Sequence, residues 1–143
     1  MLLKRKVGAL AVAAAAAAGL FVSTSGTASA GTAVANSGNS GAYVAGVTGH
    51  AATGDGNDCT YGNLCLYTGT DWTGTRFDLY TCKTYSLVGW NGNGSLWNAQ
   101  TTGQQAWLED VNHKVVTTVS GRDSTIYGFS SYNFSPIWYA KNC

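Results

Sequence analysis

All four cysteines and all five tryptophans of this chain lie between Cys59 and Cys143. An even number of cysteines in a small exported domain indicates a disulfide framework, which limits the ways the chain can fold. A zinc site is the competing interpretation. It is disfavoured because no two cysteines form a Cys-x-x-Cys pair and only two histidines are present. The compartment therefore matters, and the N-terminus predicts it.

The N-terminus has the organisation of a secretory signal peptide. A basic cluster at residues 4–6 precedes an uncharged, alanine-rich run at 7–22, and a segment of small residues ends at Ala30. The alternative, a membrane anchor, needs about 20 apolar residues, and this run is shorter. We expect a signal peptide at 1–30, cleavage after Ala30, and a secreted, extracellular protein with no membrane contact after cleavage.

Cleavage changes the charge of the chain. The full sequence holds 8 Lys+Arg and 7 Asp+Glu, and the three bases of the leader leave a net charge of −2. This value is too small for strong electrostatic steering, which argues against nucleic acid or an anionic membrane as the partner.

Four cysteines allow three pairings, and we favour Cys59–Cys65 with Cys82–Cys143. The first bond closes a short loop, and the second ties the C-terminal residue to the middle of the domain. In the loop-entropy description the long loop contributes roughly 4 kcal/mol and the short one roughly 2 kcal/mol. A domain of this size has a limited core, so these bonds matter for its stability.

The composition changes sharply near Cys59. Residues 31–57 are rich in Gly, Ala, Ser, Thr and Asn, and we expect a disordered tail there. Residues 58–143 carry strand signals separated by glycine-rich turns, with almost no helix signal, which predicts one all-β sandwich. The expected strands are Leu64–Tyr67, Arg76–Tyr80, Ser95–Asn98, Gln105–Leu108, Val115–Val119 and Ile137–Ala140.

A local pattern refines this fold. Tyr67, Trp72 and Gly74 fit aromatic-x4-aromatic-x-Gly, the hairpin signature of a βγ-crystallin Greek key, in which the glycine takes a positive φ. The stretch from Cys59 to Asn98 also resembles the secreted peptidase inhibitors typified by the streptomycete metalloproteinase inhibitor. The resemblance implies a βγ-crystallin-like sandwich of two Greek-key motifs, and Trp97 and Trp138 repeat at an offset of 41.

The resemblance also implies a function. It predicts a monomeric, non-catalytic inhibitor of an extracellular metalloproteinase that occludes the active site with a loop. The inhibitory segment of the family corresponds to Lys114–Arg122, where we expect contact through Thr117, Thr118, Val119 and Ser120. The family stiffens this segment with a close cysteine pair, which this chain lacks. In the second half, Leu108, His113 and Val115 replace the hairpin signature.

Calcium binding is a second property of βγ-crystallins. The corresponding stretch contains Asn91, Asn93 and Ser95, with no carboxylate, whereas Ca²⁺ takes six to eight oxygen ligands. We expect a glycine- and asparagine-rich turn, no cofactor, and at most weak calcium affinity.

Catalytic signatures are few. Only His50 and His113 are present, no Gly-x-Ser-x-Gly motif occurs, and Glu109 is the only glutamate. We therefore expect a binding protein and not an enzyme. Alternatives to inhibition are a crystallin-like extracellular binding or stress protein and a carbohydrate-binding module. For the last, we expect most tryptophans in the core and Trp90 exposed.

Overall fold

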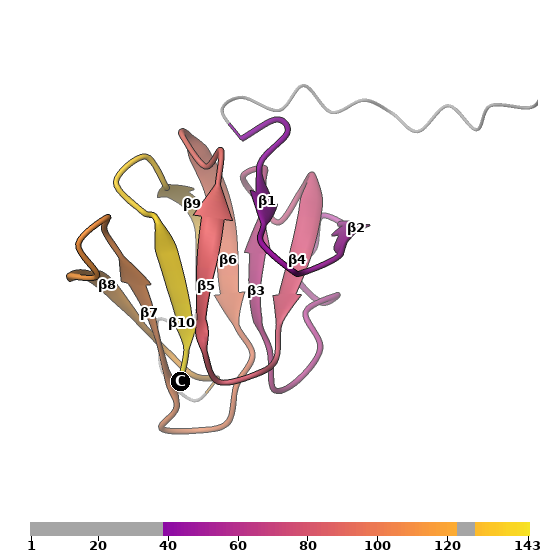
Figure 1. The fold of residues 1–143 in the computed structure, drawn as a ribbon. Coiled ribbons are helices and arrows are strands. Elements are labelled where there is room, and N and C mark those ends of the chain that lie inside the picture. The colour runs from indigo at the N-terminus through magenta and orange to yellow at the C-terminus, as the bar shows by residue number, and fades with distance from the viewer. Residues whose placement is uncertain (1–38, 123–127) are drawn as a thin grey trace, which may run out of the picture. The chain divides into compact units, whose positions relative to one another are not determined.

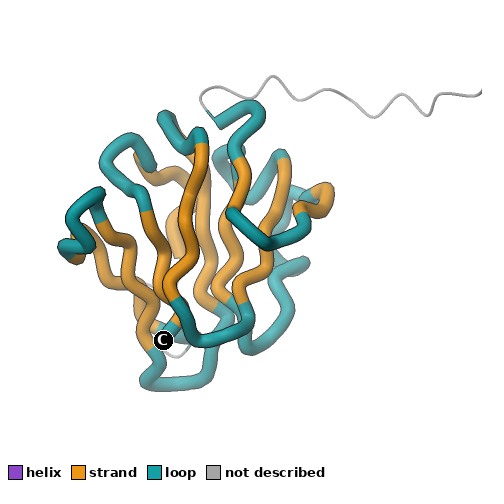
Figure 2. Tube along the Cα trace, in the orientation of Figure 1, coloured by secondary structure: helices purple, strands orange, loops and turns teal. Residues whose placement is uncertain are grey.

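The computed structural model describes residues 39–122 and 128–143. These residues form strands and loops, with no helix among them (Figures 1 and 2). The ten strands are β1 Tyr43–Val44, β2 Gly49–Ala51, β3 Leu64–Tyr67, β4 Thr75–Leu79, β5 Thr84–Val88, β6 Asn93–Asn98, β7 Gln105–Glu109, β8 Val115–Ser120, β9 Gly128–Asn133 and β10 Tyr139–Asn142. The predicted all-β class is confirmed.

The strands form two antiparallel five-stranded sheets. The first sheet has the order β1-β5-β10-β7-β8, and the second sheet has the order β2-β4-β3-β6-β9. The two halves of the chain are arranged alike: β6 lies beside β3 and β10 lies beside β7. Each half also contributes its third strand, β5 or β9, to the sheet of the other half. Neither half can therefore complete its sheet alone.

One apolar core joins the sheets. Leu64, Leu66 and Leu96 from the second sheet and Leu108 from the first are fully buried in the same cluster. Burying one such side chain stabilises the fold by about 1.5–3 kcal/mol. The alternation of buried and exposed residues in Thr84–Val88 shows how the period of a strand selects the inward face.

The N-terminal segment corrects one expectation. Residues 39–57, predicted as part of a disordered tail, instead supply an edge strand to each sheet: β1 pairs with β5, and β2 pairs with β4. Val44 is buried in the core, and the Asn39 side chain bonds the Gly92 backbone at both its oxygen and its nitrogen. The prediction of disorder rested on the low hydrophobicity of this segment. The segment is nevertheless ordered, because pairing with a neighbouring strand satisfies its backbone hydrogen bonds even where few side chains can be buried.

Both disulfides join the cysteines favoured from the sequence, Cys59 to Cys65 and Cys82 to Cys143. The leader 1–30 and residues 31–38 lie outside the described residues, so the expected cleavage after Ala30 stays a prediction. In the part of the chain that the structure describes, no helix is long and apolar enough to span a membrane.

Candidate functional site

The β7–β8 hairpin carries the residues predicted to contact a protease. β8 ends the first sheet, and within residues 39–122 and 128–143 only β7 pairs with it. The prediction that Thr117–Ser120 form an inhibitory loop is wrong: these residues lie in β8, in agreement with the strand predicted at Val115–Val119. The reason is that the β-branched run from Val115 favours extended backbone, which pairs with β7 from Gln105 onward.

The side chains of these four residues differ in access. Val119 is buried in the core, and its carbonyl accepts a hydrogen bond of 2.8 Å from Asn98 Nδ2. The Thr117 hydroxyl lies 2.7 Å from the Tyr132 hydroxyl, which links β8 to β9 of the second sheet. Thr118 is the exposed one. A protease could therefore reach Thr118 and the free backbone edge of β8, but not Val119.

The turn before β8 is short and internally bonded. The Asp110 carboxylate accepts hydrogen bonds from the backbone nitrogens of Asn112 (2.8 Å) and Lys114 (3.0 Å). The backbone closes the same turn through Asp110 N to Lys114 O at 3.0 Å and His113 N to Asp110 O at 3.1 Å. One aspartate thus holds the turn that connects two strands.

His113 holds the base of the turn. It has a φ of 61°, which is uncommon for a residue with a side chain. Its Nδ1 lies 3.0 Å from Glu109 Oε2, and its ring stacks on Tyr139 with centroids 4.0 Å apart. These contacts hold the backbone of residues 110–114 in one shape.

Apolar side chains project from this held segment. Val111 is 52% exposed, Val115 44% and Val116 47%. A register shift places Val115 opposite Glu109 and Thr117 opposite Leu108, so Val116 is the extra residue of a β-bulge. We call residues 110–116 the hairpin tip. Val111 and Asp110 were not predicted as site residues, although Asp-x-Asn before a β-branched run is a turn signal.

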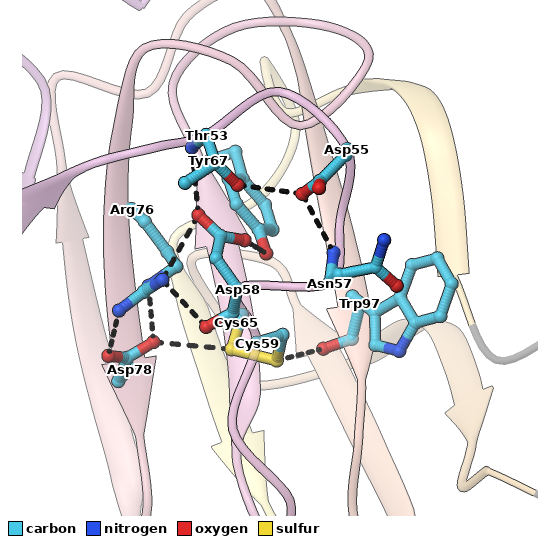
Figure 3. A network of polar contacts seen from close by, with 10 residues as sticks. All are labelled: Thr53, Asp55, Asn57, Asp58, Cys59, Cys65, Tyr67, Arg76, Asp78 and Trp97. Carbon is cyan, nitrogen blue, oxygen red and sulfur yellow. Dashed lines mark hydrogen bonds and ion pairs between the residues drawn. A yellow bond between two sulfur atoms is a disulfide. The ribbon is translucent and has the colours of Figure 1, made fainter.

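A second cluster of polar residues lies beside the disulfide Cys59–Cys65 (Figure 3). Arg76 lies between two carboxylates: its Nη1 is 3.0 Å from Asp58 Oδ2, and its Nε is 2.9 Å from Asp78 Oδ1. The Tyr67 hydroxyl donates to Asp58 Oδ1 at 2.8 Å, and Thr53 N donates to Asp58 Oδ2 at 2.9 Å. These contacts fasten residues 53–58 to β3 and β4.

The titration of this cluster fits a structural role. Burial raises the pKa of the Asp58 carboxyl, but hydrogen bonds from Thr53 and Tyr67 and the charge of Arg76 outweigh it and hold that pKa below its usual value. Burial, followed by the Asp58 carboxylate, raises the pKa of Tyr67 far above its usual value. Asp58 thus stays ionised and Tyr67 protonated, so neither is ready to exchange a proton near neutral pH.

The fold signature holds the β3–β4 turn. Tyr67 is buried, and Gly74 has a φ of 82°. The Trp72 ring packs edge-on against the ring of Trp97 in β6, with the two ring centroids 5.4 Å apart. The signature therefore ties this turn to the second sheet.

One of the calcium candidates, Ser95, has a structural role. The Ser95 hydroxyl is buried, donates to Gly69 O at 2.7 Å and accepts from Trp72 N at 2.9 Å. Gly94 lies so close to β3 that a Cβ would be 2.5 Å from Tyr67 O. Asn93 pairs with Asn133 in the sheet, and Asn91 lies in the loop before β6. The described residues contain no cluster of three acidic, cysteine or histidine side chains suited to a metal.

Two further expectations concern histidines and tryptophans. His113 lies in the β7–β8 turn and contacts Glu109 and Tyr139 of the first sheet, whereas His50 lies in β2 of the second sheet, opposite Arg76. The prediction that Trp90 is exposed is wrong. Its side chain is 3% exposed, and its ring lies between Phe77 and Phe134. Trp138, at 52%, is exposed instead.

Comparison with known proteins bears on this hairpin. Residues 52–115 match the model of peptidase inhibitor family I36, which confirms the resemblance found in the sequence. The match includes the β7–β8 turn and ends at the first residue of β8. No match to the chain was found among the curated proteins or among the solved structures.

Proposed function

Residues 52–115 match the model of peptidase inhibitor family I36, and from this premise we propose that the protein inhibits an extracellular metalloproteinase by placing its hairpin tip in the active-site cleft. The observation that carries this proposal is a held, exposed turn with apolar side chains. The carboxylate of Asp110 fixes the turn, and Val111 and Val115 project from it.

The geometry supports a substrate-like mode of binding. A valine at the tip fills an apolar pocket of the protease, and the free edge of β8 pairs with the extended backbone that lines the cleft. Thr118, one of the predicted contact residues, lies on this accessible strand. The tip gains affinity because its shape is fixed before binding, so little further ordering is needed.

The held turn also predicts slow cleavage of the bound segment. A protease that cuts within residues 110–116 leaves both new ends attached to β7 and β8, which remain paired. The ends therefore stay together in the cleft, where the bond re-forms with release of water, so net cleavage is slow.

A titration tests the proposal. The full chain is expressed with its own leader, recovered from the medium with both disulfides formed, and titrated against a thermolysin-type metalloproteinase. A serine protease serves as the control enzyme. We expect stoichiometric loss of the metalloproteinase activity alone. A folded protein that leaves the activity unchanged at micromolar concentration contradicts the proposal.

Variants locate the contact. Val111→Asp with Val115→Asp is expected to weaken inhibition by roughly a hundredfold, because charged groups must then enter an apolar pocket. Val88→Asp is the matched control: Val88 is an exposed strand valine of the same sheet, separated from β8 by β10 and β7. If Thr118→Asp abolishes inhibition and the tip variant does not, the strand is the contact.

A further inference from the structure

Trp138 is the tryptophan with the most exposed side chain among those described, and a cavity lies beside it. The cavity measures about 50 Å³ and is lined by the β5–β6 loop (Gly89, Trp90 and Asn91) and by the loop before β10 (Ser135 and Trp138). Figure 1 shows these two loops at the same end of the sheets. A single exposed apolar residue needs no explanation, but an indole at the rim of a cavity does.

The loop that carries Trp138 is held in place. Phe134 and Ile137 are buried, and Ile137 N donates to Phe134 O at 2.8 Å. The Trp138 nitrogen donates to Glu109 O at 2.9 Å, and its carbonyl accepts from Leu87 N at 2.8 Å. The indole is therefore exposed on a fixed backbone, so a ligand that stacks on it orders little of the chain.

The cavity beside the indole combines two polar side chains, those of Asn91 and Ser135, with apolar residues. None of the described residues that line the cavity is charged. The Ser135 hydroxyl donates to Asn91 O at 3.0 Å, which joins the two loops. The side-chain amide of the exposed Asn91 has no hydrogen-bond partner among the described residues, so its donors and its acceptor are free for a ligand.

We propose that Trp138, Asn91 and the cavity between them form a binding site for a neutral glycan. A pyranose ring presents an apolar face of C–H groups, which stacks on an indole, and a rim of hydroxyls, which bind amides and hydroxyls. One water molecule needs roughly 10–15 Å³ of cavity volume. The cavity therefore accepts a few hydroxyl-sized groups of the sugar while the pyranose ring lies on Trp138.

Other occupants fit less well. Single-stranded nucleic acid also stacks on aromatic rings, but it needs a positively charged groove, and the described lining has no basic residue. A protein partner would use the same indole as an anchor, and the test below separates that case.

Retention on insoluble polysaccharide tests the site. The protein is secreted from the full chain, oxidised, and mixed with cellulose, chitin or xylan. We expect retention on at least one of them and release by its soluble hexasaccharide. Trp138→Ala should lower retention roughly tenfold or more, as loss of a stacking anchor does, and Asn91→Ala should lower it by a smaller factor. Tyr80→Ala is the control, because Tyr80 is an exposed aromatic in the β4–β5 loop.

A second readout keeps the proposal testable if a variant folds poorly. The indole Nε1–H signal of Trp138, assigned by its absence in Trp138→Phe, should shift when the soluble hexasaccharide is added. The proposal is overturned if none of the three polysaccharides retains the protein, or if Trp138→Ala is retained as well as the parent. It is also overturned if Trp138→Ala weakens protease inhibition without any glycan binding, which would make the indole a protease contact.

Discussion

The two hairpin turns of the molecule occupy equivalent places in its two halves but are held differently. The β3–β4 turn, residues 68–74, is fastened to the second sheet: Asp71 N donates to Ser130 O at 2.6 Å and Trp72 packs on Trp97. The β7–β8 turn, residues 110–114, is held mainly by its own Asp110 and by His113 stacked on Tyr139. One turn is part of the core structure, and the other projects from it.

This difference shows how one arrangement of strands serves two purposes. A turn that bonds to neighbouring strands stabilises the sandwich but cannot enter a cleft. A turn that satisfies its own backbone needs no such neighbours, so its side chains are free for a partner. Changes in the first half should therefore lower stability, whereas changes in the second turn should lower binding.

The largest effect on stability is expected from Arg76→Met in the first half. The variant leaves the carboxylates of Asp58 and Asp78 without their cation in a partly buried place. We expect the free energy of unfolding in urea to fall by about 3 kcal/mol. Lys83→Met, which removes a lysine that lies over the Tyr85 ring, should change it by no more than about 0.5 kcal/mol. Equal losses in the two variants would contradict the structural role of the cluster.

Ser95→Ala should have the next largest effect. The variant leaves Trp72 N without an acceptor and Gly69 O without a donor, both in the β3–β4 turn. We expect a loss of about 2 kcal/mol, measured by urea unfolding of the oxidised protein. Ser86→Ala in β5, where the serine is exposed, is the control. Inhibition by the molecules that remain folded should be unchanged, and a lower affinity would show that the two turns are coupled.

The same contrast governs what could be predicted from the sequence. The β3–β4 turn was found through Tyr67, Trp72 and Gly74, because a buried turn places strict demands on residue type. The two strands that flank it were predicted to within one residue. The predicted strand Leu64–Tyr67 is observed as such, and the predicted strand Arg76–Tyr80 is observed at Thr75–Leu79. The exposed turn has no such signature, and the contact at residues 117–120 was predicted only from the family resemblance of Lys114–Arg122.

Strands with polar sequences were also missed. Gly128–Asn133 has glycine and serine at positions where strands usually carry β-branched residues, so its propensity is low. Pairing with β6 forms it nevertheless. Thr84–Val88 alternates correctly and could have been found from its period of two. The strand predicted at Ile137–Ala140 starts later, at Tyr139, because Ile137 closes a turn with Phe134.

Asp110→Ala should separate binding from stability in the exposed turn. The variant removes the acceptor of Asn112 N and Lys114 N, both exposed to water, so the free energy of unfolding should fall by only about 1 kcal/mol. Inhibition should weaken roughly tenfold, because the tip must then be ordered on binding. Asp110→Asn keeps an acceptor oxygen and should restore most of the affinity. Unchanged inhibition in Asp110→Ala would show that the tip is not the contact.

Acid should lower the stability contributed by the first half of the molecule, and this is the smallest of the four effects predicted here. The pKa of Asp58 lies below its usual value in the folded protein, so the folded state holds this proton less tightly than the unfolded chain does. The stability from Asp58 is complete above the usual pKa of about 3.9 and is lost as the pH falls through the lower, folded value. Asp58→Asn should be less stable than the parent at neutral pH, and the gap should close on acidification. Urea unfolding across the acid range measures this gap, and a gap that stays constant with pH would mean that the charge of Asp58 contributes nothing and that only its shape matters.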